Sequence, residues 1–116
     1  MVILVCGGKK YHDFARMTAV LDEVAEKAEG EVRVVNGACI GADLYSSAWA
    51  RLRGFKYTEV LPELVLYGNT ALSIRNQKIL DEFHPDRGIV FPGGRGTLDM
   101  LTRLFYAGIP TWVVGK

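Results

Sequence analysis

The chain of 116 residues has the length of one domain and is short for two. Apolar residues make up 49% of it and charged residues 23%, a composition that excludes a chain disordered throughout. The formal net charge of +1 disfavours binding to nucleic acid through non-specific phosphate contacts, because that function needs a basic face.

The sequence also lacks the features of a secreted or membrane protein. Two cysteines, Cys6 and Cys39, cannot form a disulfide framework. The apolar run at residues 2–6 is far too short to span a bilayer, and it lacks the basic start and the cleavage site of a signal peptide. We therefore expect a cytoplasmic protein that has reduced thiols and makes no contact with a membrane.

Apolar runs and helical periodicity alternate along the chain. Residues 2–6 predict a strand, and apolar residues at helical spacing between Phe14 and Ala28 predict a helix that Asp13 caps and Gly30 ends. The further predicted elements are a strand at 32–35, a helix at 42–52, a strand at 57–61, a helix at 72–83, a strand at 88–91, a helix at 98–105 and a strand at 111–114.

This alternation predicts the fold class. Strands that alternate with helices pair in parallel through right-handed crossovers, and strands that are apolar throughout fit a sheet covered on both faces. The sequence therefore predicts an α/β fold, a single Rossmann-like domain over residues 1–116. Its sheet is expected to be open, doubly wound and parallel, with five strands in the order 3-2-1-4-5.

Glycines gather in three of the turns that lead from a strand into a helix, at residues 7–10, 36–43 and 92–97. All three turns lie at the carboxyl edge of a parallel sheet, where open sheets of this kind bind ligands. Glycine lets a backbone approach a ligand, and the N-terminus of the following helix favours an anion. The alternative is that these glycines only tighten short turns. We expect a crevice between the first and fourth strands, flanked by the first and third of these turns.

Two charged residues are candidates for ligand contacts. Arg75 stands near the start of the third long helix, where a cation opposes the helix dipole, so a bidentate contact to phosphate or carboxylate is one interpretation. The alternative is an exposed arginine or an ion pair with Asp81 or Glu82. Asp43 lies in the first turn of the second helix, where it either complements the dipole or accepts hydrogen bonds from ribose hydroxyls.

The turn at residues 92–97 and the turn after the first strand supply further candidates. Thr97 is expected to cap the fourth helix or to contact a phosphate, and Arg95 can close over an anion. Asp99 is the nearest carboxylate to that turn, with a role toward the helix dipole as the alternative. Lys9 and Lys10 make the same edge locally basic, which suits a small anionic ligand.

Several common motifs are missing from the sequence. No GxGxxG follows the first strand, and neither a GxxxxGK[ST] loop nor a GxSxG elbow occurs. The cysteines, His12 and His84 have no metal-ligand spacing. We therefore expect neither a bound metal nor a cofactor.

The combination of motifs resembles the YspA-like SLOG domains, Rossmann-like domains related to the Lonely Guy phosphoribohydrolases and to DprA DNA-processing proteins. The resemblance spans nearly the whole chain in motif order. The segments that carry it are Val5-Cys6-Gly7-Gly8 with Tyr11, Asn36-Gly37 with Gly41-Ala42-Asp43, Trp49-Ala50-Arg51, Tyr67-Gly68, Arg75-Asn76-Gln77 and Phe91-Pro92-Gly93-Gly94-Arg95-Gly96-Thr97.

The resemblance implies a nucleotide or nucleotide-derived ligand in the crevice. Lonely Guy enzymes cleave the N-glycosidic bond of a nucleoside monophosphate, using an arginine in the third helix and the glutamate of Pro-Gly-Gly-x-Gly-Thr-x-x-Glu. Arg75 matches that arginine, but Met100 stands at the glutamate position, beside Asp99. YspA-like members commonly carry an arginine at the position of Lys9 and a tryptophan soon after that of Pro62, and this sequence has neither.

Three functions follow as hypotheses. The favoured one is a module that holds a phosphorylated nucleotide or nucleotide-derived ligand, ADP-ribose-like molecules included, as sensor, carrier or sequestering protein, because Met100 removes the usual acid–base group. The second is an N-glycosidase in which Arg75 and Asp99 are catalytic. The third, single-stranded DNA binding as in DprA, is disfavoured by the near-neutral charge. The predicted ligand-binding residues are Gly7, Gly8, Lys9, Gly37, Gly41, Asp43, Arg75, Asn76, Pro92, Gly93, Gly94, Arg95, Gly96 and Thr97.

Self-association is a further expectation. The chain is small and its helices carry many apolar residues. Relatives among the SLOG domains often dimerise through helices, so the resemblance implies a homodimer or a higher homo-oligomer.

Overall fold

Five parallel strands form one sheet in the order β3-β2-β1-β4-β5, which confirms the predicted topology. The computed structural model describes residues 1–115, so only Lys116, the last residue of the predicted domain, lies outside the described residues. The strands are β1 (Val2–Cys6), β2 (Arg33–Asn36), β3 (Lys56–Glu59), β4 (Arg87–Val90) and β5 (Thr111–Val113).

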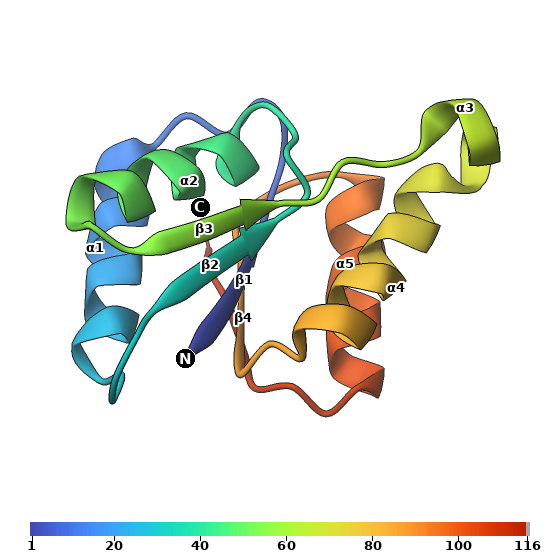
Figure 1. Cartoon of the computed structure of the whole chain (residues 1–116). Coiled ribbons are helices and arrows are strands. Elements are labelled where there is room, and N and C mark those ends of the chain that lie inside the picture. The colour runs from blue at the N-terminus through green and yellow to red at the C-terminus, as the bar shows by residue number, and fades with distance from the viewer. Residues whose placement is uncertain (116) are drawn as a thin grey trace.

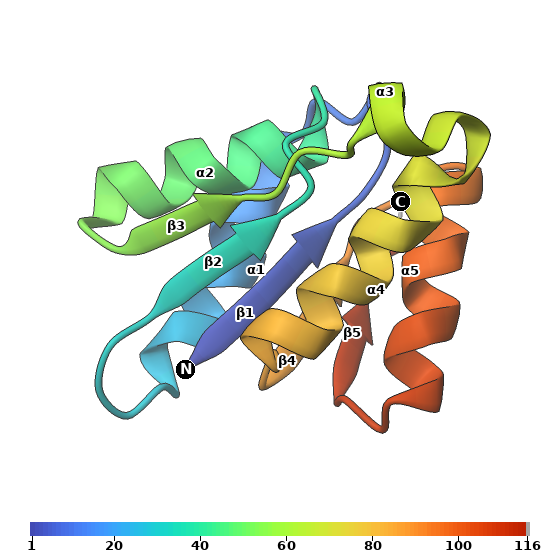
Figure 2. The same ribbon diagram turned by 45° about the vertical axis from the view of Figure 1, so that its right-hand side comes forward.

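Four long helices cover the sheet on both faces, as a doubly wound α/β fold requires. They are α1 (Phe14–Glu26), α2 (Ala42–Arg53), α4 (Ala71–Phe83) and α5 (Arg95–Tyr106). Helices α1 and α2 lie against one face, and α4 and α5 lie against the other (Figures 1 and 2). None of the helices in residues 1–115 combines the length and the hydropathy that crossing a membrane requires.

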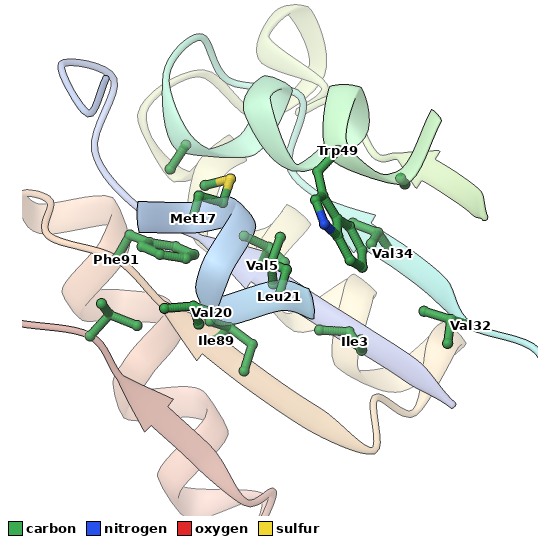
Figure 3. Packing of buried hydrophobic residues seen from close by; sticks show 13 residues of the cluster. Ile3, Val5, Met17, Val20, Leu21, Val32, Val34, Trp49, Ile89 and Phe91 are labelled. Carbon is green, nitrogen blue, oxygen red and sulfur yellow. The ribbon is translucent and has the colours of Figure 1, made fainter. Parts of the chain in front are cut away.

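The central strand β1 contributes side chains to both cores, which explains its unbroken apolar sequence. Ile3 and Val5 pack with α1 and α2, whereas Leu4 and Cys6 pack with α4 and α5. Figure 3 shows the first of these cores, in which Trp49 of α2 lies over the sheet. The two cores hold the carboxyl ends of β1 and β4 side by side, and this positions the turns that follow them.

The sequence pattern does not predict the short helix α3 (Leu64–Tyr67) or the 3₁₀ turn η1 (Gly68–Thr70) that follows it. The stretch of five residues between Pro62 and Gly68 is too short to show a helical period. No residue of either element is buried, and α3 projects beyond the sheet next to the start of α4 (Figure 1).

Candidate functional site

A cavity of about 280 Å³ lies at the carboxyl edge of the sheet, above β1 and β4. The chain leaves β1 toward α1 on one face and β4 toward α5 on the other, so the cavity marks the switch point of the strand order (Figure 2). The predicted residues that line it are Gly7, Gly8, Lys9, Gly37, Asp43, Arg75, Asn76, Gly94, Arg95, Gly96 and Thr97.

Four other predicted residues do not line this cavity: Gly41, Pro92, Gly93 and Asp99. The lining also contains residues that sequence reasoning did not assign to the site, namely Leu4, Val5, Cys6, Cys39, Leu72 and Met100. Leu72 could have been found from its position one helical turn before Arg75. The others reach the cavity through strand ends and loops that only the fold brings together.

The N-terminus of α5 opens onto the cavity. Helix α5 begins at Arg95, earlier than the sequence predicts, and its N-cap is Gly94, which makes no side-chain hydrogen bond. The predicted capping by Thr97 is therefore wrong: Thr97 is the third residue of the helix, and its hydroxyl packs against Gly93. The first N–H groups of a helix have no intrahelical acceptor and carry the positive end of its dipole. The end of α5 is thus suited to an anion.

Gly94 and Gly96 keep this helix end open, although the fold itself does not need glycine at either position. Neither residue has a positive φ, and a Cβ at either position would meet no other atom within 4 Å. Both residues line the cavity. Their missing side chains therefore leave free room above the helix N-terminus.

Arg75 of α4 is only 9% exposed. Its Nη1 donates to the carbonyl oxygens of Gly37 (2.6 Å) and Val60 (3.3 Å), and its Nε donates to Asn76 Oδ1 (3.0 Å). The guanidinium lies directly on Gly37, where a Cβ would stand 2.5 Å from Cζ. Nη2 makes no hydrogen bond with any residue from 1 to 115, so this edge of the guanidinium is available to a ligand.

Arg75 remains a cation in this setting. Burial lowers its pKa, while the nearby carboxylate of Asp43 acts in the opposite direction. An arginine starts from so high a pKa that it stays protonated in proteins. Within the described chain it forms an ion pair with neither Asp81 nor Glu82, the alternatives raised by the sequence.

Asp43 of α2 is 5% exposed and leaves one oxygen without a partner. Its Oδ2 accepts from the backbone N–H groups of Gly37 (3.2 Å) and Cys39 (3.3 Å), whereas Oδ1 has no hydrogen-bond partner. A buried carboxylate oxygen left unpaired in a protein is costly and calls for a donor. Because Asp43 lines the cavity, that donor can come from a ligand.

Burial also changes the acidity of Asp43. Desolvation raises the pKa of the carboxyl from 3.8 to about 6, against the opposing effects of the Cys39 N–H, the Arg75 cation and the Gly37 N–H. The same burial, with the charge of Asp43 adding to it, raises the pKa of the Cys6 thiol at the bottom of the cavity. Cys6 is therefore an uncharged thiol at neutral pH.

Asn36, which sequence reasoning treated only as part of a turn, holds the loop between β2 and α2 in place. Its Nδ2 lies within hydrogen-bond distance of the Asp43 carbonyl oxygen (2.8 Å) and of the hydroxyls of Ser46 and Ser47 (both 2.9 Å), and its Oδ1 accepts from the Ala38 N–H. All of this lies in the interior, since Asn36 has no exposed surface. The network ties the end of β2 to the first turns of α2, which carry Asp43.

Asp99 lies outside the cavity and is already engaged. Its carboxylate accepts from Arg103 Nε (2.8 Å), Asn76 Nδ2 (2.9 Å) and Ser73 Oγ (3.3 Å). Partial burial raises the pKa of Asp99, but the hydrogen bonds from Arg103 and Asn76 outweigh it and leave the pKa below its ordinary value. Asp99 thus connects α4 to α5, and the apolar side chain of Met100 faces the cavity in its place.

The turns after β1 and β4 are held together by backbone contacts. The Gly8 N–H donates to the Pro92 carbonyl oxygen (2.8 Å), so this N–H is already engaged within the protein and is not free to bind a ligand. The Gly8 carbonyl oxygen accepts from Tyr11 and from Ala42 at the start of α2. Gly41, with φ of 89°, packs against this turn, where a side chain would overlap the Gly8 carbonyl oxygen. Gly41 and Gly93 therefore shape the crevice without lining it.

The parallel sheet, its strand order and the cavity at the switch point define a Rossmann-like α/β domain. A family model described as "YspA, cpYpsA-related SLOG family" matches residues 1–67, which is more than half of the chain. The protein belongs to this SLOG family. No curated protein matches the chain.

Proposed function

We propose that the protein binds a phosphorylated nucleotide or nucleotide-derived ligand, including ADP-ribose-like molecules, as a sensor, carrier or sequestering module. The observation that carries this proposal is the uncapped N-terminus of α5, which opens onto the cavity beneath two glycines that the fold does not need. Membership of the SLOG family and the Rossmann-like sheet support a nucleotide-related ligand.

The polar groups around the cavity suggest how the ligand is oriented. A phosphate would be bound by the free N–H groups at residues 95–97, where the helix dipole favours negative charge. Arg75 would add charge through its free Nη2. Asp43 would accept a hydrogen bond from a ribose hydroxyl through Oδ1, which has no partner in the protein.

Calorimetric titration with adenosine 5′-monophosphate and with adenosine tests this proposal. We expect saturable binding of the monophosphate and at least tenfold weaker binding of adenosine, which cannot occupy the anion site. Arg75→Lys should weaken monophosphate binding at least tenfold, because lysine keeps the positive charge but lacks the planar guanidinium that donates two parallel hydrogen bonds. Arg51→Lys, which changes an exposed arginine of α2 that does not line the cavity, is the control and should leave the affinity unchanged. The absence of saturable heat with any phosphorylated nucleotide would contradict the proposal.

A second candidate function is hydrolysis of the N-glycosidic bond of a nucleoside monophosphate to free base and ribose 5-phosphate. In this reaction water adds to C1′ while the base leaves with a proton. The sequence favours Arg75 and Asp99 as catalytic residues, yet Asp99 is engaged by Arg103 and Asn76 outside the cavity. Asp43, with a pKa of about 6 and a free oxygen in the cavity, is better placed to supply a proton. Chromatography of the same titration mixture distinguishes the two functions: release of adenine supports hydrolysis, and binding without release supports the module.

We also propose that copies of the chain associate. Large apolar side chains remain exposed at Val65 and Leu66 of α3 and at Phe105 and Tyr106 of α5. Exposed apolar surface of this kind commonly marks an interaction site. Light scattering should therefore give a mass that is a multiple of the 12.8 kDa chain, and a monomer at all concentrations would refute association.

A further inference from the structure

The sheet ends on one side at β5, which within residues 1–115 is paired only with β4. At the two ends of the strand, the Pro110 carbonyl oxygen accepts from β4 (2.9 Å) and the Val114 N–H donates to it (2.8 Å). Because the backbone groups of successive residues alternate between the two sides of a strand, the N–H and C=O groups of Thr111 and Val113 point away from β4. An edge strand with free groups of this kind is a template for a further strand.

The edge strand on the opposite side of the sheet, β3, is protected against such pairing. It carries two exposed charged side chains, Lys56 and Glu59, and charges on an edge strand discourage the addition of another strand. The sequence of β5 is Thr-Trp-Val, without a charged residue, and Val113 is 57% exposed. Of the two edges, β5 is therefore the one that is open to a partner.

Helix α5 adds exposed apolar side chains beside this edge. Asp99 and Arg103 of α5 form hydrogen bonds with α4, and α5 is the outermost helix on its face of the sheet (Figures 1 and 2). Leu98 and Phe105, two helical turns apart, lie on the side of α5 that faces away from α4 and remain 61% and 78% exposed. Val113 points to the same face of the sheet, because its partner in β4 packs in the core beneath α4 and α5.

The strand edge and these side chains form one surface, the β5 surface, which consists of Leu98, Phe105, Thr111, Trp112 and Val113. It is complementary to itself. When two copies pair antiparallel with Trp112 opposite Trp112 of the second copy, Thr111 of each lies opposite Val113 of the other. These are hydrogen-bonded positions, so the outward N–H and C=O groups of both residues find partners. Trp112 occupies the non-hydrogen-bonded position on the two-fold axis, where aromatic pairs are favourable.

The same two-fold axis brings the two α5 helices together. Helix α5 runs antiparallel to β5, so Phe105 near the end of one helix meets Leu98 near the start of the other. An aromatic side chain exposed to this extent offers roughly 150 Å² for burial. With Leu98, Val113 and the strand edge, each copy offers roughly 600 Å², which reaches the total of about 1,200 Å² at which specific interfaces begin.

We infer that two copies of the chain dimerise through the β5 surface, which joins their sheets through an antiparallel pair of β5 strands flanked by the two α5 helices. This inference rests on the proposed association of copies and identifies its surface. The two carboxyl edges point in opposite directions in this dimer, and no residue of the β5 surface lines the ligand cavity. Dimerisation and nucleotide binding are therefore separate properties of the molecule.

Sedimentation equilibrium of the full chain and of three lysine variants tests this dimer. We expect the wild type to give twice the 12.8 kDa mass of the chain. Val113→Lys places a charge on the β5 edge of both copies and should weaken dimerisation at least tenfold. Tyr57→Lys on the exposed edge strand β3 and Val65→Lys in the exposed helix α3 are the controls, and both should leave the dimer dissociation constant unchanged.

Amide hydrogen exchange of the wild type tests the same contact without a substitution. The amides of Thr111 and Val113 should exchange at least tenfold more slowly in the dimer than in the monomer at low concentration, because each then donates to the second copy.

The outcomes separate the β5 contact from association in general. A dimer that survives Val113→Lys, or whose Thr111 and Val113 amides exchange as fast as in the monomer, overturns the β5 contact and leaves association through another surface. Loss of the dimer in Tyr57→Lys or Val65→Lys assigns the contact to β3 or α3 and also overturns it. A monomer at all concentrations overturns both the β5 contact and association, and leaves the proposed nucleotide site untouched.

Discussion

The variant Gly96→Ala should lose at least nine-tenths of its affinity for adenosine 5′-monophosphate while its fold is at least as stable as that of the wild type. Gly96 is the second residue of α5, and a Cβ there enters the open space above the N–H groups that we propose bind the phosphate. The same Cβ meets no protein atom within 4 Å. Alanine is also the better helix former by as much as about 1 kcal/mol, so a small gain in stability is expected.

Urea unfolding and calorimetric titration of the same preparation check both halves of this result. Leu98→Ala is the matched control, because Leu98 is exposed on the same helix and does not line the cavity. It should leave the affinity unchanged. If Gly96→Ala binds as tightly as the wild type, the anion does not lie at the N-terminus of α5, and the proposed orientation is wrong.

The variant Asp43→Asn should be more stable than the wild type at pH 8 and about equal to it at pH 4. Asparagine is close in shape to the carboxyl and can still accept from the N–H groups of Gly37 and Cys39, but it does not carry the buried charge. The rise of the pKa from 3.8 to about 6 corresponds to about 3 kcal/mol of stability that the wild type forgoes at high pH.

The pH dependence follows from the direction of the shift. Because the pKa of Asp43 is higher in the folded state, the folded protein binds more protons than the unfolded chain between pH 3.8 and about 6. The contribution of this group to stability is therefore complete below pH 3.8 and is lost as the pH rises through about 6. The difference in unfolding free energy between Asp43→Asn and the wild type isolates this group, because all other titrating groups are shared.

Ligand binding should respond in the opposite sense. At pH 8 the wild-type carboxylate offers Oδ1 as a charged acceptor, and a charge-assisted hydrogen bond is worth about 1 kcal/mol more than a neutral one. Asp43→Asn should therefore bind adenosine 5′-monophosphate several-fold more weakly although it is the more stable protein. A stability difference that does not vary between pH 4 and pH 8 would show that Asp43 ionises as freely in the folded protein as in the unfolded chain.

The sheet and the edge that carries the cavity could be predicted from local sequence signals. The unbroken apolar run at residues 2–6 indicates a strand buried on both faces of the sheet. The alternation of strands with amphipathic helices predicts that the strands are parallel. The positions of glycines after strands one, two and four then place the crevice. The residues of these turns can be predicted because each turn is one continuous segment between a strand and a helix.

The contacts made by the charged residues could not be predicted in the same way. Arg75 bonds to the carbonyl oxygen of Gly37, 38 residues earlier in the chain, and no local pattern indicates that pairing. Asp99 and Met100 are adjacent in sequence but point in different directions on α5, so only the packing against α4 decides which of them faces the cavity. The sequence predicts a later start of α5 than the structure has, because the glycines and the arginine at residues 94–96 are not typical of the start of a helix.

The most direct test of the account is a titration of the isotope-labelled protein with adenosine 5′-monophosphate, followed by the backbone amide resonances in NMR spectra. If the phosphate lies at the N-terminus of α5, the amides of Arg95, Gly96 and Thr97 should show the largest saturable shifts, with smaller ones near Asp43 and Arg75. Saturable shifts confined to other parts of the molecule, or no shifts at millimolar nucleotide, would contradict the claim that this crevice is an anion-binding nucleotide site.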